Sequence, residues 1–252
     1  MDIPLTIRET QQGLISKKYS AVELVDNYFE RINKYNKELN VFLTVTEDIA
    51  YKKAKEVDDL LSQNNSKILY IPVALDRTSI GFEACYDWFS TLIAKHSKNK
   101  ELDFTMLLEN DQIPDLMSYN SIYIGGGNTY KLLDYIIKNN LDKKLIDYLK
   151  KGGVVYGGSA GAIIFGKDIR TVDEENDMNY PQFLGLNFLR GYSVICHYSK
   201  SLDRKIFESV KNIKTKIIAL PENSGILLDV KGNVIETIGK VFTFDGNNKI
   251  KI

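Results

Sequence analysis

A serine stands where a protein could use it as a nucleophile, in the segment 157–161, which reads Gly-Gly-Ser-Ala-Gly. An apolar run, 153–156, precedes this segment, and a second one, 162–165, follows it. The order strand, sharp turn, helix is the nucleophile-elbow pattern, in which a strained turn exposes the serine hydroxyl above a sheet. The helix would direct its free N–H groups and its positive dipole end toward the site. The pattern predicts that Ser159 is a catalytic nucleophile; the alternative is a tight turn without chemistry.

A serine hydroxyl is a weak nucleophile until a base removes its proton, and histidine is the usual base. The chain has two histidines. His197 follows the apolar run 194–196, so it would lie at the carboxyl end of a strand, from which side chains reach active sites in α/β proteins. His96 lies between lysines and a serine at the polar end of an expected helix, which favours an exposed surface residue. We therefore expect His197 to be the base, with a packed or capping histidine as the alternative.

A carboxylate should orient the histidine and stabilise its cation. Glu222 follows Pro221 directly after the expected strand 216–220, again past a strand end. The alternatives are that Glu222 is an exposed loop carboxylate, or that Asp177 of the acidic segment 173–177 takes this role. We predict that Glu222 completes the triad.

Three glycines, 125–127, follow the expected strand 121–124. The run resembles a phosphate cradle, but it lacks both the lysine of a P-loop and the Gly-x-Gly-x-x-Gly spacing. Backbone N–H groups that approach a substrate closely also form oxyanion holes. We expect the N–H groups of Gly126 or Gly127 and of Ala160 to bind the oxyanion; the alternative is an ordinary strand-to-helix turn.

Three further residues are candidates for binding the substrate. Arg170 follows the expected elbow helix and is the obvious cation for a substrate carboxylate, with a surface salt bridge as the alternative. Asn128 ends the glycine run, and Asp177 lies in the acidic segment 173–177. This segment is long and polar enough to be a solvated lid or substrate gate.

The order of expected elements predicts two parts. Up to about residue 67 the chain is helical, since capping-box patterns at 6–9 and 20–23 each open a helix and a third helix is expected near 47–61. A short extended piece, 41–45, precedes the third helix, and the polar segment 62–66 is the best linker. From residue 68 to 252 strands alternate with helices, which indicates an α/β fold with a mostly parallel sheet covered by helices on both faces. Strands are expected at 68–74, 104–108, 121–124, 153–156, 193–196, 216–220, 225–229, 234–236 and 241–244, with helices at 81–95, 129–138 and 141–150.

The composition excludes several classes of function. The 252 residues carry 33 basic and 33 acidic side chains, so no bulk charge favours nucleic acid or an anionic membrane. No apolar run approaches the roughly 20 residues of a membrane span, and the start Met-Asp-Ile-Pro lacks a signal-peptide core. Cys85 and Cys196 lie far apart in the sequence, which suits a reducing compartment. We expect a cytoplasmic protein.

Together these residues resemble the aspartyl dipeptidase (peptidase E) family, whose relatives include cyanophycinase. The resemblance spans about 68–252 and rests on motifs in the same order. These motifs are 122–129, 158–162, 169–171, 176–178, 196–198 and 219–222. It implies a class I glutamine amidotransferase-like fold, a triad of Ser159, His197 and Glu222, cleavage of small peptides after an N-terminal aspartate, and no metal or cofactor.

The chain departs from this family in two ways. No strand of the Lys-apolar-Phe-Leu-Thr-Ser type is visible ahead of 68–74, and the loop after Arg170 is a few residues longer, which puts aspartate specificity in doubt. Residues 1–67 instead resemble the first helices of the A subunit family of the glutamyl-tRNA(Gln) amidotransferases, through 5–9, 20–25 and 39–46. The catalytic Lys-Ser-Ser triad of those amidases lies beyond this segment. The chain therefore looks like a fusion of an amidase-type helical segment with a peptidase-type domain.

We expect a serine hydrolase of small peptides that uses an acyl-enzyme. One alternative is a catalytically silent binding or regulatory module, in which the N-terminal helices dock onto one of the subunits of an amidotransferase. Another is a hydrolase of a different amide, such as a β-linked aspartyl polymer. The sheet edge that a missing first strand leaves exposed would be covered either by the N-terminal helices or by a second subunit in a homo-oligomer.

Overall fold

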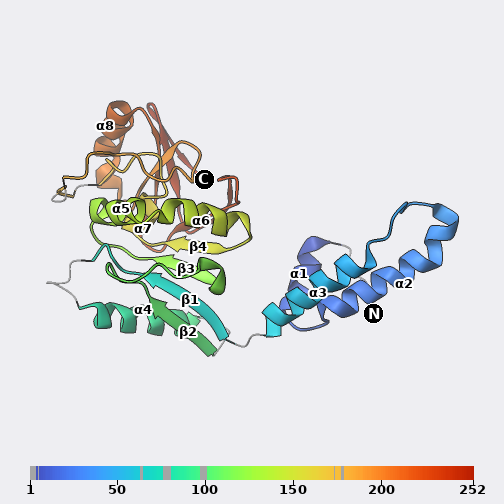
Figure 1. Cartoon of the computed structure of the whole chain (residues 1–252). Coiled ribbons are helices and arrows are strands. Elements are labelled where there is room, and N and C mark those ends of the chain that lie inside the picture. Colours follow the sequence, from blue (N-terminus) through green and yellow to red (C-terminus); the bar gives the residue numbers. More distant parts are fainter. Residues whose placement is uncertain are drawn as a thin grey trace. The chain divides into compact units, whose positions relative to one another are not determined.

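The computed structural model describes residues 4, 6–62, 65–75, 81–96, 101–172, 174–176 and 179–252. The chain divides into two compact units, Met1–Asn65 and Ser66–Ile252 (Figure 1), which we call the N-terminal and the C-terminal unit.

The N-terminal unit consists of three helices, α1 (Ile7–Ile15), α2 (Ala21–Leu39) and α3 (Glu47–Ser62). Both expected capping boxes are present, with Thr6 and Ser20 as N-caps. Asp58 of α3 accepts hydrogen bonds from the first two N–H groups of α2, those of Ala21 at 2.6 Å and Val22 at 3.0 Å. The two longer helices are therefore joined by a charged cap as well as by packing. No strand forms at 41–45, because this stretch has no neighbouring strand to pair with among the described residues.

The strands of the C-terminal unit form three groups. A first sheet has the order β2-β1-β3-β4, in which β3 pairs in parallel with both β1 and β4. A second sheet has the order β10-β9-β6-β5, with β5 and β6 parallel and β9 antiparallel to its neighbours; β7 and β8 form a separate antiparallel ribbon. The strands are β1 (Asn65–Ile71), β2 (Glu101–Met106), β3 (Ser121–Ile124), β4 (Val154–Gly157), β5 (Tyr192–Ile195), β6 (Lys216–Ala219), β7 (Gly225–Leu228), β8 (Val234–Ile238), β9 (Phe242–Asp245) and β10 (Asn248–Lys251).

Helices cover both faces of the first sheet: α4 lies on one side, and α5, α6 and α7 lie on the other (Figure 1). The helices are α4 (Phe82–His96), α5 (Thr129–Lys138), α6 (Leu141–Lys150), α7 (Ala160–Ile163) and α8 (Asp203–Ile213), with short 3-10 turns η1 (Leu116–Ser118) and η2 (Lys200–Leu202). The largest hydrophobic core lies between the first sheet and the face covered by α5, α6 and α7. Ile122, Leu133 and Ile164 are fully buried in this core. This confirms the expected α/β class. No helix in the described part of the chain is long and apolar enough to cross a membrane.

One α-helix and one strand were not expected from the sequence. Helix α8 buries Ile206 and Val210, which are four residues apart and therefore share one helical face. Strand β10 pairs with β9 around the turn at 245–247. Most of its residues are polar, so the sequence does not show the apolar pattern by which a strand is recognised. The expected single sheet is in fact divided into two hydrogen-bonded sheets. β4 is an edge strand of the first sheet, and β5 is an edge strand of the second.

Candidate active site

Ser159 lies in the turn between the end of β4 and the start of α7, with φ 50° and ψ −114°. This left-handed backbone is uncommon for a residue with a side chain and costs about 1–3 kcal/mol. The flanking glycines make the turn feasible. A Cβ on Gly157 would lie 2.4 Å from the carbonyl oxygen of Gly161, and one on Gly161 would lie 2.2 Å from that of Ile124. The spacing of small residues in the sequence is therefore a steric requirement of the elbow.

The structure brings Ser159, His197 and Glu222 together. The Ser159 Oγ atom lies 3.1 Å from Nε2 of His197, and Nδ1 of His197 lies 2.5 Å from Oε1 of Glu222. The geometry fits the tautomer with a proton on Nδ1, which donates to Glu222 and leaves Nε2 to accept from Ser159. Nucleophile, base and orienting carboxylate in this arrangement are the parts of a hydrolase triad.

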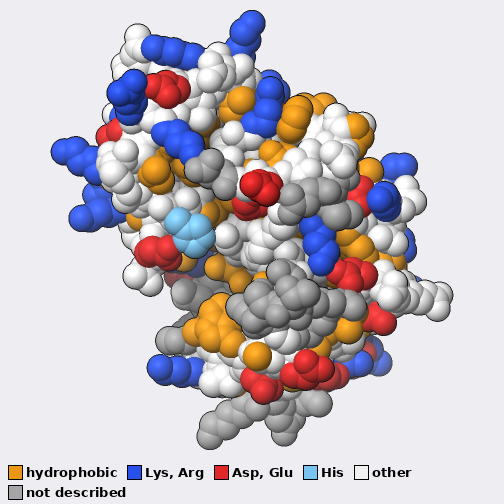
Figure 2. Space-filling view, turned by 90° about the vertical axis from the view of Figure 1, so that its left-hand side faces the viewer, with side chains coloured by type: hydrophobic (Ala, Val, Ile, Leu, Met, Phe, Trp, Pro, Cys, Tyr) orange, Lys and Arg blue, Asp and Glu red, His pale blue; other side chains and the backbone are white. Residues whose placement is uncertain are grey.

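The two adjacent parallel strands β5 and β6 bring His197 and Glu222 to the same edge. The Leu220 N–H donates to Ile195 O at 2.9 Å, and the Tyr198 N–H donates to Leu220 O at 3.0 Å, so the pairing continues past both strand ends. His197 lies between these bonds with φ 55°. The side chains of His197 and Glu222 are 65% and 73% exposed, so solvent and substrate can reach them. Figure 2 shows a histidine at the surface of this side of the molecule with an acidic side chain next to it.

Three backbone N–H groups, two in the glycine loop and one at the start of α7, are candidates for binding an oxyanion. A Cβ placed on Gly126 would lie 3.1 Å from the Ser159 Cβ, so the glycine loop directly adjoins Ser159. Gly127 has φ +131°, and a Cβ there would lie 2.1 Å from Ala74 O, so only glycine fits. Among the described residues, the N–H groups of Gly126, Gly127 and Ala160 donate no hydrogen bond.

Arg170 is tied to Asp168, a partner that was not expected from the sequence. Its Nε donates to Asp168 Oδ1 at 3.0 Å and its terminal nitrogen to Oδ2 at 2.6 Å, and the guanidinium lies 5.0 Å from the centre of the Phe183 ring. The hydrogen bonds from Arg170 to Asp168 raise the pKa of the guanidinium, which stays charged. The Arg170 side chain is still 43% exposed, whereas that of Asp168 is 7% exposed. The spacing Asp-x-Arg was the only signal for this pair in the sequence.

The acidic segment contacts the start of α5. Glu174 accepts hydrogen bonds from the N–H of Thr129 at 2.6 Å and from its hydroxyl at 3.1 Å. Asn128 is the N-cap of α5, and its side-chain amide donates to Glu175 O at 3.2 Å. The oxygen and the nitrogen of the Asn128 side-chain amide thus both form hydrogen bonds within the protein. Asp177 lies outside the described residues.

Cys196 lies beneath the elbow, with its Sγ 3.7 Å from Ser159 O. Burial, with a smaller contribution from the Glu222 carboxylate, raises the pKa of the thiol to about 12. The thiol is therefore protonated at neutral pH and cannot compete with Ser159 as a nucleophile. No cluster of three or more metal-binding side chains occurs in the described ranges.

Comparisons with known proteins agree on one family for most of the chain. The model of Peptidase family S51 matches residues 41–238. Peptidase E of Shewanella denitrificans is 26% identical over 189 residues, which cover 71% of this chain and 77% of that protein. The crystal structure of a peptidase from an acI-B1 Actinobacterium covers 74% of this chain and 80% of its own, with 19% identity and a TM-score of 0.54, a likeness of fold alone.

A second similarity concerns a different enzyme. The A subunit of the glutamyl-tRNA(Gln) amidotransferase from Hahella chejuensis is 40% identical over 73 residues. This match covers 29% of the present chain and 15% of the amidotransferase polypeptide. The chain therefore spans only a small part of that polypeptide, in contrast to its match with peptidase E.

Proposed function

The chain belongs to peptidase family S51 and is a serine peptidase, and on this premise we propose that Ser159, His197 and Glu222 hydrolyse small peptides through an acyl-enzyme. The observation that carries the proposal is the pair of contacts at His197, 3.1 Å to Ser159 Oγ and 2.5 Å to Glu222 Oε1. An imidazole that accepts a hydrogen bond from a serine hydroxyl and donates one to a carboxylate is arranged to take the serine proton.

The first half of the reaction forms the acyl-enzyme. His197 Nε2 takes the Ser159 proton while Oγ bonds to the carbonyl carbon of the substrate, whose oxygen becomes negative. The N–H groups of Gly126 or Gly127 and of Ala160 donate to this oxygen. When the tetrahedral species collapses, the C–N bond breaks and Nε2 returns its proton to the leaving amine.

Water completes the cycle by the same route. Nε2 removes a proton from the water as its oxygen bonds to the acyl carbon, and the Ser159 oxygen then leaves and regains a proton from Nε2. Throughout, Glu222 accepts the Nδ1–H bond and stabilises the imidazolium that forms twice per turnover. The steps balance with the peptide, one water molecule and the side chains of this chain.

We assign Arg170 to a substrate carboxylate, in keeping with a preference for short acidic peptides such as aspartyl dipeptides. Its charge is held in place by Asp168, and its side chain is partly exposed. The segment that carries it lies along β5, since the hydroxyl of Thr171 donates to Val194 O, three residues before His197. Arg170→Met should raise KM for an aspartyl dipeptide about tenfold or more, with a smaller effect on a neutral peptide. An equal effect on both peptides would remove this assignment.

The triad is tested by labelling. Purified protein is treated with a small fluorophosphonate, and the labelled peptide is identified by mass spectrometry. We expect an adduct on Ser159 that disappears in Ser159→Ala and falls by several orders of magnitude in His197→Ala. An adduct elsewhere, or wild-type turnover by Ser159→Ala, would refute the proposal. A Ser201→Ala variant, which removes an exposed serine of η2, serves as the matched control.

The N-terminal unit supports a second, binding function. Several large apolar side chains there are exposed, among them Ile7 at 79%, Leu39 at 66% and Leu43 at 89%. Together with the similarity to the amidotransferase polypeptide, they favour docking onto an amidotransferase partner. Pull-down with purified amidotransferase subunits, comparing wild type with Leu39→Glu/Leu43→Glu, distinguishes this from hydrolysis alone. If wild type and the double variant are retained equally, or if neither is retained, docking onto this partner is excluded.

A further inference from the structure

The imidazole of His197 makes few contacts that would hold it in position. The side chain is 65% exposed and bonds only to Ser159 and Glu222 among the described residues. Its backbone has φ 55°, a left-handed conformation that costs a residue with a side chain about 1–2 kcal/mol. The neighbouring residues must therefore supply the energy that keeps this backbone in place.

Tyr198, the next residue, is buried and packs against Phe242 and Phe244. Its N–H donates to Leu220 O at 3.0 Å, and its ring centre lies 5.2 Å from that of Phe242 and 6.0 Å from that of Phe244. Because consecutive Cα atoms are about 3.8 Å apart, a displacement of Tyr198 moves the backbone of His197 directly.

The hydroxyl of Tyr198 belongs to a network of three side chains, Tyr198, Asp203 and Lys249, which we call the Tyr–Asp–Lys network. The hydroxyl donates to Asp203 Oδ1 at 2.6 Å. The Lys249 ammonium donates to the two carboxylate oxygens of Asp203 at 3.0 and 2.9 Å and also contacts the Tyr198 hydroxyl. The network joins the end of β5 to the first residue of α8 and to β10.

The network is charged and partly shielded from water. The side chains of Lys249 and Asp203 are 24% and 26% exposed, and the ammonium lies 4.8 Å from the centre of the Phe242 ring. Burial disfavours the charges, but the hydrogen bonds outweigh it, so that the pKa of Asp203 is lowered and that of Lys249 is raised. Both partners therefore stay ionised at neutral pH, where charge-assisted hydrogen bonds are strong and directional.

We propose that the Tyr–Asp–Lys network positions the catalytic histidine, with Tyr198 as the positioning residue that holds His197 between Ser159 and Glu222. The inference rests on the proposed triad, because it concerns how that triad is aligned. Among the described residues, none of the three side chains of the network hydrogen-bonds to Ser159, His197 or Glu222. Its contribution is to keep the strained backbone at His197 in the one orientation from which both ring nitrogens reach their partners.

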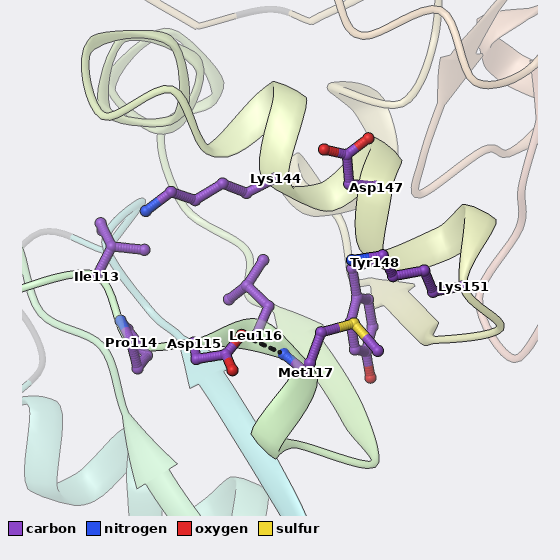
Figure 3. A pocket seen from close by; sticks show the side chains of 9 residues that line it. All are labelled: Ile113, Pro114, Asp115, Leu116, Met117, Lys144, Asp147, Tyr148 and Lys151. Carbon is purple, nitrogen blue, oxygen red and sulfur yellow. Dashed lines mark hydrogen bonds between the residues drawn. The ribbon is translucent and has the colours of Figure 1, made fainter.

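The test compares full-length wild type with Tyr198→Phe and Asp203→Asn. Tyr148→Phe is the matched control, because Tyr148 is a buried tyrosine whose hydroxyl also donates one hydrogen bond, to Tyr119 O at 3.0 Å. Tyr148 belongs to α6 and lines a cavity of about 290 Å³ together with residues around η1 (Figure 3), and neither Ser159 nor His197 lines this cavity. The first readout is the second-order rate of inactivation by a small fluorophosphonate, corrected for the folded fraction. The second is the low-field proton NMR signal of the His197 Nδ1–H bound to Glu222.

We expect Tyr198→Phe to slow inactivation about tenfold and to broaden or remove the low-field signal, with Asp203→Asn giving a smaller loss in the same direction. Tyr148→Phe should stay within about twofold of wild type. If wild type is labelled on Ser159 and both network variants match Tyr148→Phe in rate and signal, the positioning role is wrong. If Tyr198→Phe fails to fold, Asp203→Asn decides by the same two readouts. Failure of wild type itself to react at Ser159 would refute the triad instead.

Discussion

The carboxylate of Glu174 accepts both hydrogen bonds that Thr129 offers at the start of α5, from its N–H at 2.6 Å and from its hydroxyl at 3.1 Å. Thr129 is fully buried. It lies two residues after Gly127, the last glycine of the loop that adjoins Ser159. A carboxylate at this end of a helix also interacts favourably with the helix dipole. The acidic segment thus supports the start of α5, directly after the glycine loop.

Glu174→Gln should weaken this support. The amide can accept one of the two hydrogen bonds but has no charge, so we expect the free energy of unfolding to fall by about 1 kcal/mol. Because the glycine loop would be less well fixed, the rate of fluorophosphonate labelling should fall about threefold. Denaturant titration and labelling kinetics measure the two effects. Glu175→Gln is the control, since only the backbone oxygen of Glu175 contacts Asn128; an equal loss there would contradict the prediction.

Gly161→Ala should disrupt the nucleophile elbow. The added Cβ would lie 2.2 Å from Ile124 O, so the backbone of α7 or that of β3 must shift. We expect the free energy of unfolding to fall by about 2–4 kcal/mol and labelling of Ser159 to be lost. Gly225→Ala is the matched substitution, because nothing lies within 4 Å of a Cβ there. The prediction fails if both alanine variants have the same stability in thermal unfolding.

Cys196 should resist alkylation in the folded protein. Burial raises its pKa to about 12, so almost none of the reactive thiolate is present at neutral pH. In Cys85→Ser, where Cys196 is the remaining cysteine, iodoacetamide should react at a rate limited by unfolding. Mass spectrometry with and without denaturant measures the difference. Rapid modification under native conditions would show that the thiol is accessible and the elbow more open than described.

We expect Asp203 to make the free energy of unfolding depend on pH in the acidic range. Its pKa is lowered from 3.8, since hydrogen bonds from Tyr198 and Lys249 outweigh the effect of burial. A lowered carboxyl pKa contributes stability that is fully present above the unfolded value and is lost as the pH falls through the folded value. The difference in unfolding free energy between wild type and Asp203→Asn should therefore shrink from about pH 6 to about pH 3. A difference that stays constant over this range would mean that the charge of Asp203 does not stabilise the fold.

Local patterns determined much of what could be predicted. The bounds of α5 and α6 were expected to the residue, because Asn128 caps α5 and the apolar periodicity of each helix is complete within ten residues. The turn at Ser159 could be predicted from the sequence for the same reason. Its glycines are adjacent in sequence and are required by contacts within one turn and the neighbouring strand.

Tertiary structure decided which distant side chains meet. The sequence left Glu222 and Asp177 as alternative partners of His197, and the parallel pairing of β5 with β6 brings Glu222 to 2.5 Å from it. Likewise, Lys249 reaches Tyr198 across 51 positions of sequence because β9 pairs with both β6 and β10. Strand pairing depends on the free energy of the whole sheet rather than on any one segment. For this reason the sequence alone predicted the turn at Ser159, whereas the alignment of His197 and Glu222 with it emerged only from the fold.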